Sequence, residues 1–543
     1  MTNLILLKNV VILPELFLGL SIVYILLYGS IVSTHKTYPL IQNSILKLSV
    51  LILFFCIFLL YNDLPFLSNE STLFFNDTIV TDYLSLCSKL LIAFFSLLCL
   101  IVIRFYLKDQ KINQFEYSII ILIAILGFFL LCSANDLITA YLAIELQSLA
   151  FYVMSAFKKN SSFSVEAGLK YFVLGSFSSA LLLLGFSIIY GMLGTLNFED
   201  FKTIFNMQDA GLTHIEFVRS TDLELNTMFD ACFDPTLLQL ALVLVLVSLF
   251  FKLAVAPLHV WSPDVYENSP SSSTVFFAVV SKIGVLVLLI RLFHHTFHGF
   301  IYTWRYYVVV LAVLSVIAGS FTALEQRKLK SLLAYSSISH IGYILIAFSS
   351  GNLVSLQSLY AYIIVYMLAG VCIWSIFLSL RLKTFYFKKQ NKDLTDFVLL
   401  VKSNNILAIC FSLVLLSMAG FPPLIGFITK MGIFMSAIES TMYFVAVISI
   451  LTSVVSTFYY IRIIKIIYFE KVIVGNLFYP LQYIESFIIV ITFFSSIYLF
   501  INPTLLYLVS YKMSLLGYTP LSSGNSHSGA SVDLDIFSLI NIS

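Results

Sequence analysis

Charged residues are scarce in this chain: Asp, Glu, Lys and Arg make up 11% of its 543 residues, whereas hydrophobic residues make up 60%. A water-soluble domain could not cover its surface with so few charges, so a soluble protein is excluded. The net charge of +2 gives no indication of a nucleic-acid partner. The composition therefore predicts a polytopic membrane protein that contacts membrane lipids and no nucleic acid.

Cysteine is also sparse, and its spacing excludes two classes of site. The seven cysteines lie mostly inside apolar runs without paired spacing, at positions 56, 87, 99, 132, 232, 372 and 410. This pattern indicates small core residues rather than a disulfide framework or a metal site. Nucleotide-binding glycine patterns and nucleophile constellations are missing as well. We therefore expect no metal, no cofactor and no redox centre in this chain.

Long apolar runs dominate and predict an all-α protein with about fourteen transmembrane helices, at about 20 residues per span. The first run lacks the cleavage site of a signal peptide and indicates a retained helix. The run 403–438 is too long for one span and contains Gly420, Pro422 and Pro423, so we expect two half-helices there. The predicted spans are 10–33, 45–62, 84–106, 115–133, 137–157, 164–194, 236–259, 271–297, 302–323, 329–349, 353–380, 403–438, 441–468 and 481–502.

The distribution of Lys and Arg between the loops predicts the orientation. If the N-terminus lies outside, eighteen of the 30 basic residues fall in inside loops, six fall in outside loops and six fall within spans. An excess of basic residues marks the inside. Both termini are therefore predicted on the outside.

The segment 251–261, FKLAVAPLHVW, follows the apolar run 237–250 without a turn signal. Lys252 therefore lies inside a membrane helix, where a lysine costs roughly 3 kcal/mol or more. Pro257 lacks a backbone donor and clashes with the preceding turn, so the helix breaks or kinks there. These two costs, so close together, indicate a functional role. The alternative is a lysine that snorkels to the interface beside an incidental proline.

Other ionisable residues within the predicted spans are functional candidates. Glu145 lies near the middle of the fifth span, Lys282 lies in the eighth, and Lys430 follows the Pro422–Pro423 break. His340 lies among serines in the tenth span, where serines or water could simply satisfy it. Three further lysines lie within about seven residues of a helix end, and we expect them to snorkel: Lys47, Lys89 and Lys170.

These residues predict a proton pathway. A buried lysine is driven toward neutrality by desolvation and is held charged by a nearby carboxylate. If Glu145 approaches Lys252, the lysine is protonated, and if it withdraws, the lysine releases its proton. A row of such groups, bridged by water and His340, forms a proton wire with a switch at one end.

The breaks at Pro257 and Pro422–Pro423 are about 165 residues apart, and each has a lysine close by. Paired interrupted helices are typical of transporters with inverted repeats. We therefore expect two inverted five-helix repeats, with helices 7 and 12 broken. The predicted segments are 1–114 with helices 1–3, 115–297 with helices 4–8, 298–468 with helices 9–13, and 469–543 with helix 14 and the tail.

Two segments are too polar to span a membrane. Residues 197–235 are rich in Asp and Glu and predict a surface loop, either a docking element or a tolerated insertion. The tail from Ser510 is of low complexity and predicts a flexible segment.

Five motifs together resemble one family: ELQSLAFYV (145–153), AGLKYFVLGSFSSALLLLG (167–185), FKLAVAPLHVWSPDVYENSP (251–270), KLKSLLAYSSISHIGY (328–343) and SMAGFPPLIGFITK (417–430). On these motifs, residues 10–500 resemble the antiporter-like membrane subunits of respiratory complex I, and among them the NADH dehydrogenase subunit 2 family. The resemblance implies a proton channel built on fourteen helices. By motif, Glu145 matches the family's fifth-helix glutamate, Lys252 its broken-helix lysine, Lys282 its bridging lysine and Lys430 its twelfth-helix lysine.

The resemblance also implies a setting. The chain would lie in the mitochondrial inner membrane beside other membrane-arm subunits of complex I, with NADH, FMN, iron–sulfur clusters and ubiquinone bound elsewhere in the complex. Two other interpretations stay open, a subunit of a multisubunit cation/proton antiporter and a structural, non-pumping spacer. The acidic segment and the tail depart from the family pattern.

Overall fold

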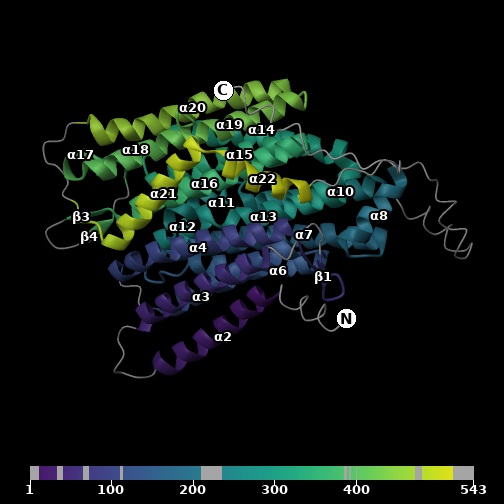
Figure 1. Ribbon diagram of the computed structural model, residues 1–543, viewed down its shortest axis with the longest axis horizontal. Coiled ribbons are helices and arrows are strands. Elements are labelled where there is room, and N and C mark those ends of the chain that lie inside the picture. Colours follow the sequence, from purple (N-terminus) through teal and green to yellow (C-terminus); the bar gives the residue numbers. More distant parts are fainter. Residues whose placement is uncertain are drawn as a thin grey trace, which may run out of the picture.

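The structure is a computed structural model that describes residues 12–33, 41–64, 72–110, 114–209, 235–383, 388–390, 393–398, 400–470, 478 and 480–517. Nearly all of the described chain is helical (Figure 1). Helices suit a membrane because each backbone donor finds its acceptor within the same segment. The helices are α2 (Leu13–Ser33), α3 (Ile41–Asp63), α4 (Tyr83–Asp109), α5 (Glu116–Ser133), α6 (Leu137–Ser155), α7 (Ser162–Leu193), α8 (Phe198–Asp209), α10 (Pro235–Leu253), α11 (Trp261–Asn268), α12 (Ser271–Val279), α13 (Ser281–Ile290), α14 (Ile301–Glu325), α15 (Leu329–Ser350), α16 (Leu353–Ser379), α17 (Leu400–Ser403), α18 (Asn405–Ala419), α19 (Ile425–Glu439), α20 (Tyr443–Tyr468), α21 (Tyr483–Ile501) and α22 (Thr504–Gly517).

The remaining elements are short. The π-helix η3 (Arg291–Thr296) extends α13, the 3₁₀ helix η4 (His298–Phe300) precedes α14, and the 3₁₀ helix η5 (Leu394–Phe397) precedes α17. Strand β1 (Thr72–Phe74) pairs antiparallel with β2 (Ile79–Thr81), with Thr72 opposite Thr81. Strand β3 (Arg381–Lys383) pairs antiparallel with β4 (Lys388–Gln390). These hairpins do not alter the predicted all-α class.

The predicted spans are confirmed. Thirteen helices in the described part of the chain are long and apolar enough to cross a membrane. Helices α18 and α19, of 15 residues each, form the predicted pair of half-helices. The seventh span is broken as expected, since α10 ends before Pro257 and α11 begins after it. The division into segments 1–114, 115–297, 298–468 and 469–543 stays a prediction.

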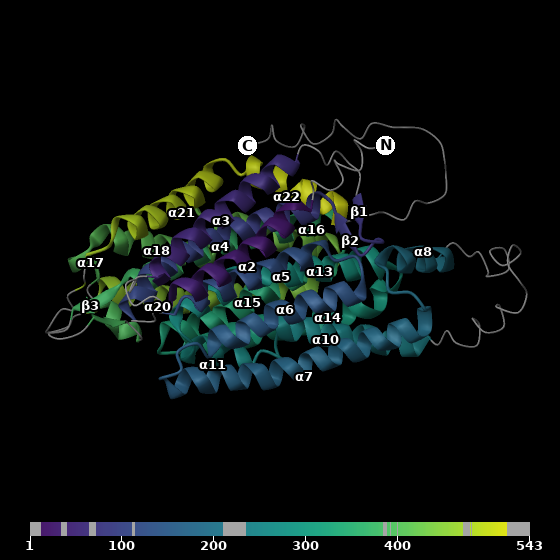
Figure 2. The same cartoon turned by 90° about the horizontal axis from the view of Figure 1, so that it is seen from below.

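The buried centre of the bundle is formed by α12, α13, α15 and α16, which lie between α2 and α20 in Figure 1. In the view turned by 90°, α7 and α21 lie at opposite edges (Figure 2). In the most apolar stretch of α15, 94% of the residues are buried, against 22% for α2. The central helices therefore face protein on all sides, and an outer helix such as α2 leaves most of its residues unburied.

Four local predictions need correction or completion. Residues 198–209, predicted as loop, form α8, because Phe201 and Phe205 pack on Phe297 with ring centroids 5.9 and 5.7 Å apart. Residues 210–234 lie outside the described residues. The tail, predicted flexible from Ser510, continues as α22 to Gly517, and 518–543 lie outside the described residues.

The eighth span has an unpredicted interruption at Val280, between α12 and α13. Six cysteines are buried and free, as predicted, and Cys232 lies outside the described residues.

Candidate functional site

The break in the seventh span places Lys252 in the last turn of α10. The backbone of this break is satisfied by protein, because the Phe251 carbonyl accepts a hydrogen bond from Trp261 Nε1 at 2.9 Å. Lys252 itself is half-buried. Its Nζ donates to the Tyr152 hydroxyl at 3.3 Å and lies 5.7 Å from the centroid of that ring. Tyr152 comes from α6, so the broken end of α10 is tied to the helix that carries Glu145.

Glu145 lies on α6 at the spacing that brings Ser148 and Tyr152 onto the same side of the helix. The Ser148 hydroxyl is 3.4 Å from Glu145 Oε2 and lies beside the Tyr152 hydroxyl as well. Glu145 Oε1 is buried without a hydrogen-bond partner. Among the described residues no direct ion pair joins Glu145 to Lys252. Ser148 and Tyr152 instead connect the two groups, and contact through a single water stays a prediction.

A small cavity extends from Lys252 toward the eighth span. Its lining includes Ser148 of α6, Lys252 of α10, and Ser281 and Val285 of α13. Ser281 is the residue directly before Lys282. The cavity therefore joins the first break to the helix that carries the next lysine.

The interruption at Val280 places Lys282 in the first turn of α13, and 6% of this residue is exposed. Its Nζ donates to the Tyr366 hydroxyl at 2.9 Å and lies 4.7 Å from the centroid of the same ring. Tyr366 belongs to α16, a central helix. Lys282 thus has a neutral phenol rather than a carboxylate as its partner.

His340 lies on α15 and is held by two further tyrosines. Its Nδ1 is 2.6 Å from the Tyr362 hydroxyl and its Nε2 is 3.0 Å from the Tyr460 hydroxyl. The His340 ring centroid is 5.3 Å from that of Tyr366, the partner of Lys282. The Tyr366 side chain therefore lies between the imidazole and Lys282, and each imidazole nitrogen has a tyrosine hydroxyl beside it.

The second break places Lys430 against the end of the preceding half-helix. Helix α18 ends at Gly420, which has a φ of 87°, and Lys430 Nζ donates to the freed Ala419 carbonyl at 2.8 Å. The Nζ also lies 5.4 Å from the centroid of the Tyr343 ring. A Cβ at Gly420 would lie 2.8 Å from Lys430 Cδ, so the close approach needs glycine. The freed carbonyl faces protein, as the Phe251 carbonyl does at the first break, and the prediction that neither break exposes bare backbone to lipid stays a prediction.

A second small cavity connects Lys430 to His340. Its lining includes His340, Tyr366, Ser417, Thr429 and Lys430. We call Lys252, Lys282, His340 and Lys430 the central row. Its three lysines contact tyrosines or a backbone carbonyl. Lys252, His340 and Lys430 line a cavity, and Tyr366 lies between Lys282 and His340.

The tyrosines of this site were missed by sequence reasoning. Their five positions are Tyr152, Tyr343, Tyr362, Tyr366 and Tyr460. With 31 tyrosines in the chain, residue type alone carries no signal. The one local indication is the spacing of Tyr362 and Tyr366, which places both on one side of a central helix.

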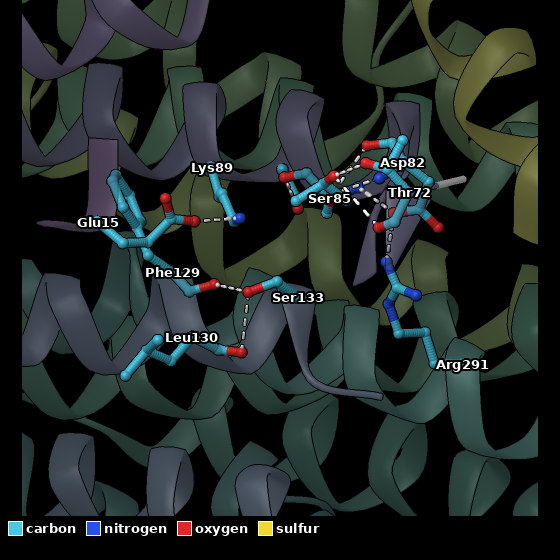
Figure 3. A network of polar contacts seen from close by, with 11 residues as sticks. Glu15, Thr72, Asp82, Ser85, Lys89, Phe129, Leu130, Ser133 and Arg291 are labelled. Atoms are coloured by element: carbon cyan, nitrogen blue, oxygen red, sulfur yellow. Dashed lines mark hydrogen bonds and ion pairs between the residues drawn. The ribbon is translucent and has the colours of Figure 1, made fainter. Parts of the chain in front are cut away.

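Two ion pairs lie outside the central row, near the start of α4. Lys89, predicted to snorkel, has no exposed surface and pairs with Glu15 of α2, so that prediction is wrong (Figure 3). Arg291, which lies within the predicted span 271–297, is buried in η3 and pairs with Asp82 at 2.6 Å. Lys47 is exposed, and the Lys170 side chain is 44% exposed, which agrees with their predicted surface positions.

Residues 134–456 match the family described as NADH:quinone oxidoreductase/Mrp antiporter, transmembrane. The chain belongs to this family. It is 37% identical to NADH-ubiquinone oxidoreductase chain 2 of Marchantia polymorpha, over 92% of this chain and 97% of the relative. It is also 37% identical to NADH-quinone oxidoreductase subunit N of Pelagibacter ubique, over 85% and 89%.

Solved structures show the same fold. A chain of respiratory complex I from Thermus thermophilus with bound aureothin matches with a TM-score of 0.71 and 25% identity, over 91% of this chain and 98% of the other. A chain of the Mrp complex from Dietzia matches with a TM-score of 0.76 and 18% identity, over 94% and 97%. The second likeness concerns the fold alone.

Proposed function

We propose that this chain is a proton-translocating membrane-arm subunit of NADH:ubiquinone oxidoreductase, respiratory complex I. The observation that carries the proposal is the central row, in which three buried or half-buried lysines and a histidine follow one another through hydroxyls and two cavities. The names of the relatives support the assignment to complex I, and the plant mitochondrial relatives support the mitochondrial inner membrane. The excess of basic residues in inside loops supports termini on the intermembrane-space side.

The central row would move a proton in steps between neutral and charged side chains. Glu145, reached through Ser148 and Tyr152, would hold Lys252 protonated when its charge is close and release the proton when it is not. Water in the first cavity would carry the proton to Lys282. The imidazole of His340 can accept at one nitrogen and donate from the other, so it would pass the proton through the second cavity to Lys430.

The chemistry that drives these steps would lie in other subunits. On this proposal, NADH, FMN, the iron–sulfur clusters and ubiquinone bind elsewhere in the complex, and this chain contributes translocation to the overall reaction. Its partners would be neighbouring membrane-arm subunits, together with the lipid that contacts outer helices such as α2.

Two alternatives to this proposal are a subunit of a cation/proton antiporter complex and a non-pumping spacer, and each requires a different kind of evidence. A subunit of a cation/proton antiporter complex is favoured by the family description, which names both classes, and by the likeness to the Mrp chain at 18% identity. The relatives at 37% identity carry the names of complex I subunits instead. A non-pumping spacer shares the family and the fold, so only a measurement on the intact complex separates it from a pump.

The test replaces Lys282 by methionine, which keeps the volume but cannot hold a proton. Because the partner of Lys282 is the neutral Tyr366, the variant leaves no buried carboxylate unpaired, and we expect the complex to assemble. NADH–quinone activity and proton uptake in vesicles should both fall to a small residual level. Lys47→Met, the same change at an exposed lysine, serves as the control and should leave both unchanged. An assembled Lys282→Met complex with full activity and full pumping would leave only the spacer.

A further inference from the structure

A group of three ionisable side chains lies apart from the central row, where α2, α3 and α4 meet. Glu15 is in the first turn of α2, Asp63 is the last residue of α3, and Lys89 is in the second turn of α4. Consecutive helices cross the membrane in opposite directions, so these three positions lie near the same face. We call these residues the N-terminal charge cluster.

All three members are buried. Lys89 has no exposed surface, Asp63 is 3% exposed and Glu15 is 8% exposed. Lys89 Nζ donates to Glu15 Oε1, and Asp63 interacts electrostatically with both of the others. The distance from the start of α4 to Lys89 is about 10 Å at 1.5 Å per residue, so the cluster is a short way inside the membrane face.

The charges of this cluster do not balance. Two ionised carboxylates and one ammonium leave a net charge of −1, and an uncompensated buried charge is so costly that such groups take up or lose a proton instead. The neighbouring ion pair of Arg291 with Asp82 differs in this respect, because one cation meets one anion there (Figure 3). The imbalance therefore distinguishes the N-terminal charge cluster from that ion pair.

Two carboxylate oxygens of the cluster have no hydrogen-bond partner among the described residues. Glu15 Oε2 and Asp63 Oδ2 are buried, and neither has a hydrogen-bond partner among the described residues. Ionised carboxylate oxygens only accept, whereas a protonated carboxyl group supplies a donor. One added proton would cancel the surplus charge of the three side chains and turn one of these buried oxygens into a donor.

Among the described residues, the neighbours of the cluster supply no other balancing charge. On α3 the neighbour of Glu15 is the Cys56 thiol, and on α5 the neighbour of Lys89 is the Cys132 thiol. On α22, Lys512 lies over the Tyr83 ring at 5.9 Å and acts on Cys87. Within the described residues, no group of three His, Cys, Asp or Glu side chains could hold a metal ion.

We propose that Asp63, beside the Glu15–Lys89 ion pair, is a proton-binding site that holds one exchangeable proton. The proton comes from water at the nearby membrane face and forms an O–H bond on the Asp63 carboxyl group, whose Oδ2 is buried without a partner among the described residues. The site lies outside the central row and does not rest on the proposed function of that row.

Infrared difference spectroscopy of the assembled complex, recorded between two pH values without turnover, tests this site. A protonated carboxyl group has a carbonyl band that shifts in D₂O. We expect such a band in the parent complex and its loss in Asp63→Asn, which leaves a balanced Glu15–Lys89 pair. Glu116→Gln removes one exposed carboxylate at the start of α5 and should retain the band.

Two further arms keep the test decisive. Glu15→Gln leaves Asp63 with Lys89 and should also lose the band, so it replaces Asp63→Asn if that variant fails to assemble. Lys282→Met should retain the band whether or not the central row pumps. A band unchanged in both carboxylate variants would overturn the proposal. Displacement of the band by sodium at constant pH would overturn it as well, because the site would then take a monovalent cation.

Discussion

The cations of the central row and those near the start of α4 are buried to similar degrees but have different partners. Lys282 and Lys430 are 6% and 4% exposed and donate to a phenol and to a backbone carbonyl. Lys89 and Arg291 are 0% and 8% exposed and pair with carboxylates. The degree of burial alone therefore does not distinguish a lysine that can transfer a proton from a cation that stays charged in an ion pair.

The difference lies in what remains when the cation loses its proton or its charge. A lysine beside a hydroxyl can become neutral and leave only neutral groups behind. A lysine beside a single carboxylate leaves a buried anion, which costs several kcal/mol. The central row therefore suits proton transfer, whereas the ion pairs near α4 hold helices together, and the second carboxylate of the N-terminal charge cluster is what adds proton binding there.

The largest expected effect comes from Lys89→Met. This change leaves Glu15 buried without its cation, and we expect the free energy of unfolding to fall by about 3–5 kcal/mol, with loss of assembled complex. The double variant Glu15→Gln with Lys89→Met removes this pair and leaves only Asp63, which can bind a proton, so it should recover most of the assembly. Blue-native gels and thermal inactivation would measure both. Equal assembly in the single variant and the parent would contradict the assigned role of the ion pair.

An intermediate effect is expected from Tyr366→Phe. The ring stays, so packing is retained, but Lys282 loses the hydroxyl that accepts its hydrogen bond. Such a bond contributes about 1–2 kcal/mol, so proton uptake in vesicles should fall roughly tenfold while assembly is unchanged. Tyr306→Phe, at an exposed tyrosine of α14, is the matched control. Unchanged proton uptake in Tyr366→Phe would show that the phenol is not part of the pathway.

The smallest effect is expected from Lys170→Gln. Its partners Glu166 and Asp264 are at 2.9 and 3.2 Å, yet all three side chains are about half exposed. Exposed ion pairs are screened by solvent and contribute little. Activity, proton uptake and thermal inactivation should match the parent, and a loss of activity would place Lys170 among the functional residues.

Local features of the chain were enough to predict the spans and their breaks. Apolar runs of sufficient length become membrane helices because lipid offers no partner for backbone groups. Pro257 and Pro422–Pro423 remove backbone hydrogen bonds wherever the rest of the chain goes. The lysines beside those breaks, and Lys282 within its span, were predicted for the same reason, because a charge in hydrocarbon is costly in any fold.

The partners of those charges depended on tertiary structure. Glu15 and Lys89 are 74 residues apart, Asp82 and Arg291 are 209 apart, and Lys282 and Tyr366 are 84 apart. No local pattern distinguishes Lys89, which is fully buried, from Lys170, which is half exposed, since both lie near a helix end. Whether such a lysine snorkels to water or meets a carboxylate depends on which helix packs against it, and that is decided only when the bundle assembles.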